Sequence, residues 1–266
     1  SITCGNPIVK MGNVLDGFPP HMDDFPIHQR FLVSKKKSCD IILELQKSKA
    51  DFLICYLPVG SIDAVTFYAK CALAAGVSFI NAMPVFIGSS AEWIKKFEQK
   101  GLLVIGDDIK SQIGATILHR AIVNLFNERG CEIDSSYQLN IGGNTDFLNM
   151  IDKKRLKLKF ESKIESVKSQ YHKPLNNIYA GPAEYISYLG DNKIAYIDVS
   201  GRGFGNLPIK IDLKISVTDS PNSAGVMVDI IRLSKIALDN GIHGTVDEIS
   251  AFGFKHSFKQ FTDGIV

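Results

Sequence analysis

Residues 106–112, with the sequence G-D-D-I-K-S-Q, place adjacent carboxylates, an ammonium group and a hydroxyl within one short stretch. The stretch follows an apolar run at 102–105 and precedes a helical pattern at 113–127, so we expect a strand-to-helix crossing there. Backbone N–H groups and the dipole at a helix N-terminus favour a bound anion. Open α/β sheets also bind ligands at the carboxyl ends of their strands. The stretch therefore predicts an anion-binding site.

Two lysines farther along the chain have the spacing of a second anion site. Lys159 and Lys163 are four residues apart, so on a helix their ammonium groups share one face. Because like charges at that spacing repel, one interpretation is a phosphate clamp in which one lysine has a lowered pKa and transfers a proton. The alternative is a pair of solvated lysines. The sequence also leaves two interpretations of Asn144, Asp191 and Asp219: they belong to a ligand-binding site, or they form ordinary helix caps or turns.

Alternating elements in the first half of the chain must position these groups. Continuous apolar runs predict three strands that are buried on both faces, at 51–57, 77–82 and 102–105. Helical patterns alternate with them, at 62–75, 91–100 and 113–127. This alternation predicts a doubly wound parallel sheet. A short helix is also expected at 40–47, after a mostly looped segment at 1–34.

The pattern changes after Gly130. We expect strands at 133–141 and 194–199, a charged helical stretch at 146–168, and a last helix at 224–240 that Asn222 caps. A further strand at 209–217 alternates strictly between apolar and polar residues, so an internal core or a subunit interface must cover its apolar face. The predicted fold class is α/β, a partial doubly wound parallel sheet plus a second α+β domain with a mostly antiparallel sheet. The first domain is predicted to comprise residues 1–130 and 222–266, and the catalytic and oligomerisation domain residues 131–221.

Composition and missing motifs narrow the function. The 266 residues have a net charge of +2 and no apolar run near the length of a membrane span, so we expect neither nucleic acid nor a membrane as partner. Five scattered cysteines without C-x-x-C spacing, and an N-terminus without a signal-peptide pattern, favour the cytoplasm. The six histidines lack metal-ligand spacing. The G-R-G-F-G stretch at 201–205 precedes a strand, not a helix, and so predicts a hairpin connection instead of a dinucleotide fingerprint.

Five sequence blocks resemble the myo-inositol-phosphate synthase family, particularly its shorter archaeal and actinobacterial branch. They occur in family order, from about Gly12 to Lys255, as Y-L-P-V-G-S (56–61), N-A-M-P-V-F-I (81–87), G-D-D-I-K-S-Q-I-G-A-T (106–116), Q-L-N-I-G-G-N-T-D-F-L-N-M (138–150) and D-S-P-N-S-A-G (219–225). The resemblance implies an NAD-dependent inositol-3-phosphate synthase with a Rossmann-like domain, which isomerises D-glucose 6-phosphate to 1D-myo-inositol 3-phosphate. The implied steps are oxidation at carbon 5, enolisation at carbon 6, intramolecular aldol cyclisation and reduction of the ring ketone.

The resemblance also assigns site residues. It places Lys159 and Lys193 at the reacting oxygens as proton donors and acceptors, and it assigns Lys163 and Lys255, with Ser111, to phosphate binding and substrate orientation. The nicotinamide end of NAD is implied to contact Asp108, Ser111, Asn144, Thr145, Asp146, Asp191, Asp219 and Ser220. The rest of the cofactor is implied to contact Leu57, Pro58, Val59, Gly60, Ala82 and Met83. The family's assembly is a homotetramer built on the open sheet of the second domain. Some members use a divalent cation near the carboxylates, which the sequence leaves open.

The family's fold begins with a glycine-rich strand–turn–helix and an acidic ribose contact, and this sequence begins after them. Two interpretations follow: a fragment of a longer chain, or a paralogue that binds a nucleotide poorly. Two other functions compete with the synthase reaction. One is a non-catalytic oligomeric protein that keeps the pocket, and the other is a related NAD enzyme acting on another sugar phosphate.

Overall fold

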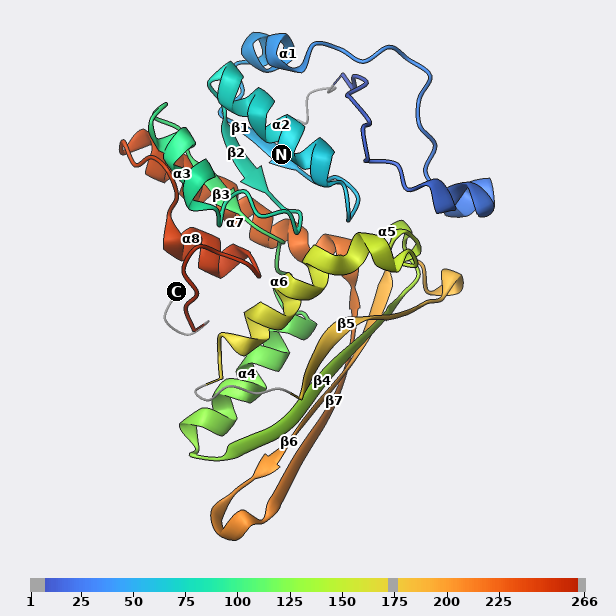
Figure 1. Cartoon of the computed structure of the whole chain (residues 1–266), viewed down its shortest axis with the longest axis vertical. Coiled ribbons are helices and arrows are strands. Elements are labelled where there is room, and N and C mark those ends of the chain that lie inside the picture. The colour runs from blue at the N-terminus through green and yellow to red at the C-terminus, as the bar shows by residue number, and fades with distance from the viewer. Residues whose placement is uncertain (1–7, 172–176, 263–266) are drawn as a thin grey trace, which may run out of the picture.

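The first of two sheets is parallel and three-stranded. The computed structural model describes residues 8–171 and 177–262, and Figure 1 shows this sheet in the upper part of the molecule. Its strands are β1 (Phe52–Cys55), β2 (Ser78–Asn81) and β3 (Val104–Gly106), in the order β1-β2-β3. All pairings are parallel, which confirms the predicted sheet, although each strand is shorter than its apolar run.

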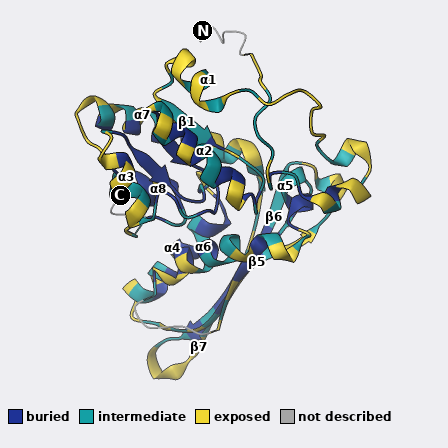
Figure 2. Cartoon of the chain, turned by 45° about the horizontal axis from the view of Figure 1, so that its top comes forward, coloured by how far each residue is buried: buried dark blue, intermediate teal, exposed yellow. Residues whose placement is uncertain are grey.

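Helices cover both faces of the parallel sheet, as its apolar strands require. One core joins Phe79 of β2 to residues of α2 (Ile62–Ala75) and α3 (Ala91–Glu98). The neighbouring Ile80 points the other way, into a core with α7 (Asp219–Asp239) and α8 (Asp247–Gly253). Successive side chains of a strand point to opposite faces, so the two layers follow from this alternation. Figure 2 shows the buried strands between the helices.

The segment before the first strand is mostly irregular, as predicted, and is tied to the parallel sheet by a carboxylate. It contains two 3-10 helices, Pro20–Asp24 and Ile27–Gln29, and precedes α1 (Ile41–Ser48). Asp16 accepts hydrogen bonds from the backbone N–H groups of Asp63 (2.9 Å) and Ala64 (2.8 Å). Because these groups lie in the first turn of α2, Asp16 caps that helix from a distant part of the chain.

The second sheet is mostly antiparallel, as predicted, with the order β5-β4-β6-β7. Its strands are β4 (Glu132–Gly142), β5 (Ile178–Tyr185), β6 (Asn192–Arg202) and β7 (Pro208–Thr218). Only the β4–β5 pairing is parallel among these strands. β6 and β7 form a hairpin in which Arg202 pairs with Pro208, which confirms the hairpin interpretation of residues 201–205.

Two helices, α4 (Ala115–Glu128) and α6 (Lys157–Lys168), lie on one face of this sheet (Figure 1). The apolar row of β7 packs on a core that includes Phe126 of α4 and Val199 of β6. The row therefore contacts an internal core but is only partly buried, and the subunit interface stays a prediction. The opposite face presents three tyrosines that are each 41% exposed, Tyr137, Tyr179 and Tyr196. The division into domains at residue 130 stays a prediction, although α4 packs on the second sheet.

Two helix predictions were wrong in their bounds. The stretch at 146–168 is divided into α5 (Thr145–Asn149), a 3-10 helix (Lys153–Leu156) and α6, because Asp152 caps a new turn by accepting from Lys154 N at 3.0 Å. The last helix begins earlier than predicted, at Asp219, since its first turn tolerates Pro221. Asn222 is not its cap: the side-chain amide donates to the carbonyl of Ile113 instead.

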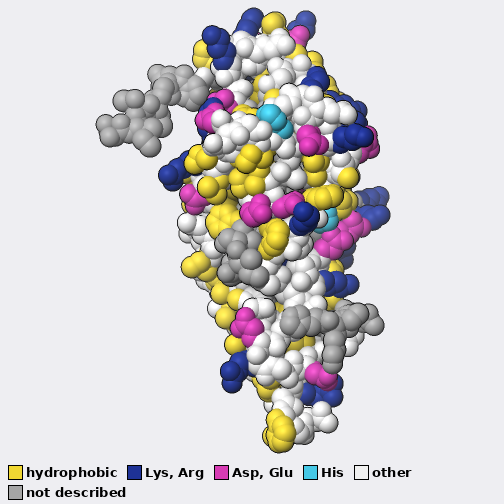
Figure 3. All heavy atoms as spheres, turned by 90° about the vertical axis from the view of Figure 1, so that its left-hand side faces the viewer, with side chains coloured by type: hydrophobic (Ala, Val, Ile, Leu, Met, Phe, Trp, Pro, Cys, Tyr) yellow, Lys and Arg dark blue, Asp and Glu magenta, His cyan; other side chains and the backbone are white. Residues whose placement is uncertain are grey.

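Strand β5 was missed altogether. Its sequence, I-Y-A-G-P-A-E-Y, has no regular alternation and contains Gly181 and Pro182. Its pairing with β4 defines it instead. Among the described helices, none has the length and apolar character needed to cross a membrane. On the face drawn in Figure 3, basic and acidic side chains are interspersed.

Candidate active site

A cavity of about 420 Å³ lies between the carboxyl ends of β1 and β2 and the second sheet with its helices. Most of the predicted site residues line it together: Lys159, Lys163, Lys193, Lys255, Leu57, Pro58, Val59, Ala82, Met83, Asp108, Ser111, Asn144, Thr145, Asp146, Asp219 and Ser220. The predicted residues Gly60 and Asp191 are not in its lining. The structure therefore brings all four lysines, from three separate segments, to one site.

Asp108 is held at the cavity floor by its backbone and by its carboxylate. Its N–H donates to the carbonyl of Met83 (3.0 Å), which fixes the 106–112 stretch against the end of β2. Its carboxylate accepts from Lys255 Nζ (2.8 Å) and from the hydroxyl of Ser162 (2.7 Å). Burial alone would raise the pKa of Asp108, but the charges of Lys255 and Lys159 outweigh burial and lower it. Asp108 is therefore an ionised partner of Lys255.

Two other lysines are paired with carboxylates in the same way. Lys159 Nζ on α6 donates to Asp146 Oδ2 at 2.9 Å, and Lys193 on β6 donates to Asp219 at the start of α7. Burial favours the neutral form of Lys159, but the charges of Asp146 and Asp108 outweigh burial and raise its pKa. This ammonium group stays protonated and can donate to a developing oxyanion.

Lys163 differs from the other three lysines. It lies one turn from Lys159 on α6, is only 7% exposed, and has no carboxylate partner among residues 8–171 and 177–262. Burial, and then the charges of Lys159 and Lys255, lower its pKa well below the ordinary value of lysine. Three of the four lysines are thus paired with aspartates. A bound anion would favour the protonated form of the unpaired Lys163, so the site suits an anionic ligand.

Asp191, one of the two predicted residues outside the cavity lining, is hydrogen-bonded to two residues that form the lining. Asp191 Oδ1 accepts from Asn144 Nδ2 (3.0 Å) and from the hydroxyl of Ser220 (2.6 Å), both of which line the cavity. Asn144 also caps α5 by accepting from the N–H of Phe147 (3.2 Å), which confirms the cap interpretation, while its role in a binding site stays a prediction.

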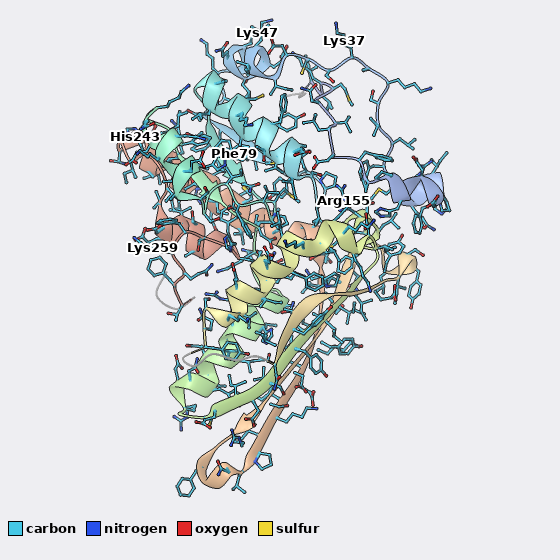
Figure 4. All side chains as sticks on the ribbon, in the orientation of Figure 1. Lys37, Lys47, Phe79, Arg155, His243 and Lys259 are labelled. Atoms are coloured by element: carbon cyan, nitrogen blue, oxygen red, sulfur yellow. The ribbon has the colours of Figure 1, made fainter. Side chains whose placement is uncertain are left out.

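The loop after β1 is clamped by an arginine. Arg155, labelled in Figure 4, donates through Nε to the carbonyl of Val59 (3.1 Å), which also accepts from Asn149 Nδ2 (2.9 Å). Gly60 has a φ of +88°, and a Cβ there would lie 2.6 Å from Cβ of Arg155. Gly60 therefore allows the close approach that holds Val59 at the cavity wall.

Sequence reasoning missed several lining residues, including Phe31, Gln138, Asn140, Asn149 and Ser223. A signal existed for Gln138 and Asn140: with Ser136 they form a polar row at alternate positions of β4, and all three are buried. A buried polar row on a strand needs partners or a ligand. Phe31 offered no such signal, because it lies in the irregular segment.

Comparison with known proteins identifies the family. The sequence model described as Myo-inositol-1-phosphate synthase matches residues 114–220. An inositol-3-phosphate synthase of Mycolicibacterium smegmatis is 45% identical over 264 residues, covering 97% of this chain and 71% of the relative. This chain belongs to the inositol-3-phosphate synthase family. Another member, the inositol-3-phosphate synthase of Corynebacterium glutamicum, is 45% identical over 95% of this chain and 72% of its own length. The family is an enzyme family.

Solved structures agree with the family's fold. The structure of Ari2 is 37% identical, with a TM-score of 0.65 over 81% of this chain and 59% of that chain. A myo-inositol-1-phosphate synthase-related protein from Thermotoga maritima is 26% identical, with a TM-score of 0.67 over 80% of this chain and 62% of that chain. The chain thus spans about three-fifths of these two structures. The predicted recognition and fold class are confirmed.

The chemistry of the cavity residues fits a dinucleotide such as NAD. Residues 57–59 and 82–83 follow the carboxyl ends of β1 and β2, which is where open α/β sheets bind such cofactors. They offer an apolar wall, while Asn144 and Thr145 provide hydrogen-bonding groups beside it. For a metal the fit is weaker: the described residues include no group of three or more His, Cys, Asp or Glu side chains able to hold an ion. The divalent cation stays a prediction.

Proposed function

We propose that this chain carries the active site of an inositol-3-phosphate synthase, which uses NAD to isomerise D-glucose 6-phosphate to 1D-myo-inositol 3-phosphate. The observation that carries the proposal is the cluster of four lysines and three aspartates around one cavity in a member of this family. A sugar phosphate needs cationic groups for its phosphate and proton donors for the oxygens that gain charge during the reaction. The cluster can supply both.

Bound NAD would supply the reversible oxidation that carbon 5 of the sugar requires. The chain's residues then have separate tasks. Lys159, kept protonated by Asp146, and Lys193, paired with Asp219, hold protons at the reacting oxygens. Lys163 has no ion-pair partner among the described residues, so it is the natural partner of the phosphate.

Burial makes these charges effective. Asp108 is only 3% exposed and Lys163 only 7%, so little water screens their field. Charges in such a site act more strongly on a transition state than they would in water. The three ion pairs also hold the lysines in place before substrate arrives, which reduces the reorganisation needed during the reaction.

The test is to supply a protein containing this chain with D-glucose 6-phosphate and NAD, and to follow product formation together with binding of each ligand. We expect an inositol phosphate to form with no net consumption of NAD. Binding of NAD without this product would favour a related enzyme acting on another sugar phosphate. Absence of binding of both ligands would favour a non-catalytic oligomeric protein.

We also propose a homotetramer, assembled over the uncovered face of the second sheet, in the cytoplasm. The three half-exposed tyrosines of that face support a contact, because tyrosine is enriched at protein interfaces. Tyr196→Glu should lower the mass measured by analytical ultracentrifugation, whereas Lys235→Glu on α7 should leave it unchanged. An unchanged mass for Tyr196→Glu, or a monomeric wild-type protein, would contradict this assembly.

A further inference from the structure

We propose that His119 is a positioning residue: with the carbonyl of Gly181 at the other end of one hydrogen-bond series, it holds the side-chain amides of Gln138 and Asn140 so that the cavity wall offers N–H donors to the oxygens of a sugar phosphate. The inference rests on the proposed function for the identity of that ligand. His119 lies on α4 and is fully buried, and it is not in the cavity lining. It therefore acts through other residues and does not touch the substrate.

Helix α4 covers one face of β4 (Figure 1), and His119 on this helix contacts the polar row of the strand. Its Nε2 is hydrogen-bonded to the hydroxyl of Ser136, and its Nδ1 lies 3.4 Å from Oε1 of Gln138. Gln138 Nε2 donates to Asn140 Oδ1 at 3.0 Å, and Asn140 Nδ2 donates to the carbonyl of Gly181 at 2.7 Å. One chain of hydrogen bonds thus leads from the buried histidine to two residues of the cavity.

The donor-to-acceptor direction of this hydrogen-bond series is fixed by its last acceptor, the carbonyl of Gly181. The carbonyl of Gly181 can only accept, so the amide nitrogen of Asn140 must face it and the amide oxygen must face Gln138. That oxygen in turn requires the nitrogen of Gln138, which leaves the oxygen of Gln138 towards His119. His119 must then carry its proton on Nδ1 and accept from Ser136 at Nε2.

The charge state of the histidine agrees with this order. Burial lowers the pKa of His119 to about 4, so the ring is neutral at pH 7 and carries a single N–H. A flipped Gln138 would place its NH₂ group against that N–H, donor against donor. His119 therefore holds Gln138 in one of its two orientations.

This orientation matters for the cavity because each amide nitrogen carries two hydrogens. Within the described part of the chain, Gln138 Nε2 and Asn140 Nδ2 each have one acceptor, so each keeps a second N–H. Both residues line the cavity beside the lysines. Neutral donors of this kind suit phosphate and sugar oxygens, and they add no further positive charge beside the four lysines.

A matched pair of substitutions tests the role. In His119→Asn, the side-chain amide can place an N–H near the position of Nδ1 and so keep the donor to Gln138. In His119→Gln, the amide reaches the position of Nε2 instead, and the donor to Gln138 is lost. We expect His119→Asn to stay within about threefold of wild type, and His119→Gln to raise both the KM for glucose 6-phosphate and the Kd for inorganic phosphate about tenfold, with kcat changed less. Both variants should unfold at similar temperatures, since each keeps one of the two partners.

A second comparison guards against a purely structural effect. In a Gln138→Leu background, His119→Gln should have no further effect on the Kd for inorganic phosphate, because the amide that His119 orients is gone. The proposal would be overturned if His119→Asn and His119→Gln lost affinity for phosphate equally. It would also be overturned if His119→Gln raised the Kd as much in the Gln138→Leu background as in wild type. If wild type binds phosphate but forms no inositol phosphate, the proposed function fails while this comparison of Kd values still decides the role of His119.

Discussion

Removing the unpaired lysine of the cavity should stabilise the empty protein and weaken its affinity for anions. The perturbation is Lys163→Met, which replaces a buried ammonium group by an apolar side chain of similar length. Three aspartates already pair with the other lysines, so this substitution breaks no ion pair among the described residues. Relieving a buried, unpaired charge should increase the free energy of unfolding by about 1–2 kcal/mol. For a chain of this size, that raises Tm by roughly 2–6 °C.

The affinity for an anion should change in the opposite direction. Two unit charges 4 Å apart attract each other by about 4 kcal/mol at an effective dielectric constant of about 20. Because the pKa of Lys163 is lowered, holding this lysine in its protonated form uses part of that attraction. A net loss of about 2–3 kcal/mol remains, which corresponds to roughly a 30- to 150-fold higher Kd for inorganic phosphate.

The pH dependence of folding stability provides a second test, because its direction can be predicted. The folded protein holds the pKa of Lys163 below that of the unfolded chain, so the unfolded chain binds more protons between the two values. Wild-type stability should therefore rise with pH across that window, up to the ordinary lysine pKa of about 10.4, and the rise contributed by Lys163 should be absent from Lys163→Met.

The assay is thermal unfolding with and without inorganic phosphate, together with calorimetric titration. Lys168→Met is the matched control, because it makes the same change at an exposed position of the same helix. We expect the control to behave as wild type. A Lys163→Met protein that is less stable than wild type, or that binds phosphate with unchanged affinity, would refute the reasoning.

Two further predictions concern the catalytic lysine and the clamped loop. Lys159→Ala should abolish turnover without unfolding the protein, since the Asp146 carboxylate it leaves is 40% exposed and can be solvated; retained activity in the turnover assay would contradict the assigned role. Gly60→Ala should lower the free energy of unfolding by about 2–4 kcal/mol in denaturant titrations, because the new Cβ would clash with Arg155 as well as straining a positive φ. Gly76→Ala, which has a positive φ but open space around it, should cost only about 1 kcal/mol, and equal costs at the two glycines would show that the clash is unimportant.

The parts of the fold that follow from local pattern were predictable. The two cores of the parallel sheet meet at Phe79 and Ile80, and continuous apolar runs of this kind predict a strand buried on both faces. The alternation in β7 predicted its covered face in the same way. Strand β5 could not be predicted, because its residues lack a pattern of their own and its pairing with β4 defines it.

The same distinction applies to the candidate site. Spacing alone suggested that Lys159 and Lys163 share a helix face, and the family resemblance supplied Lys193 and Lys255. The pairing of each lysine with a particular aspartate depends on contacts between distant segments, such as Lys255 with Asp108, and no local pattern encodes it. The capping of α2 by Asp16 is another contact of this type.

The central claim is that this cavity closes the carbon chain of glucose 6-phosphate into a ring. The most direct test uses D-glucose 6-phosphate labelled with ¹³C at carbons 1 and 6, supplied with NAD to a protein containing this chain. Cyclisation joins these two carbons, so the account predicts a product whose carbon NMR spectrum shows one-bond coupling between the labels, and no such product with Lys159→Ala. A phosphorylated product in which the two labelled carbons stay uncoupled would contradict it.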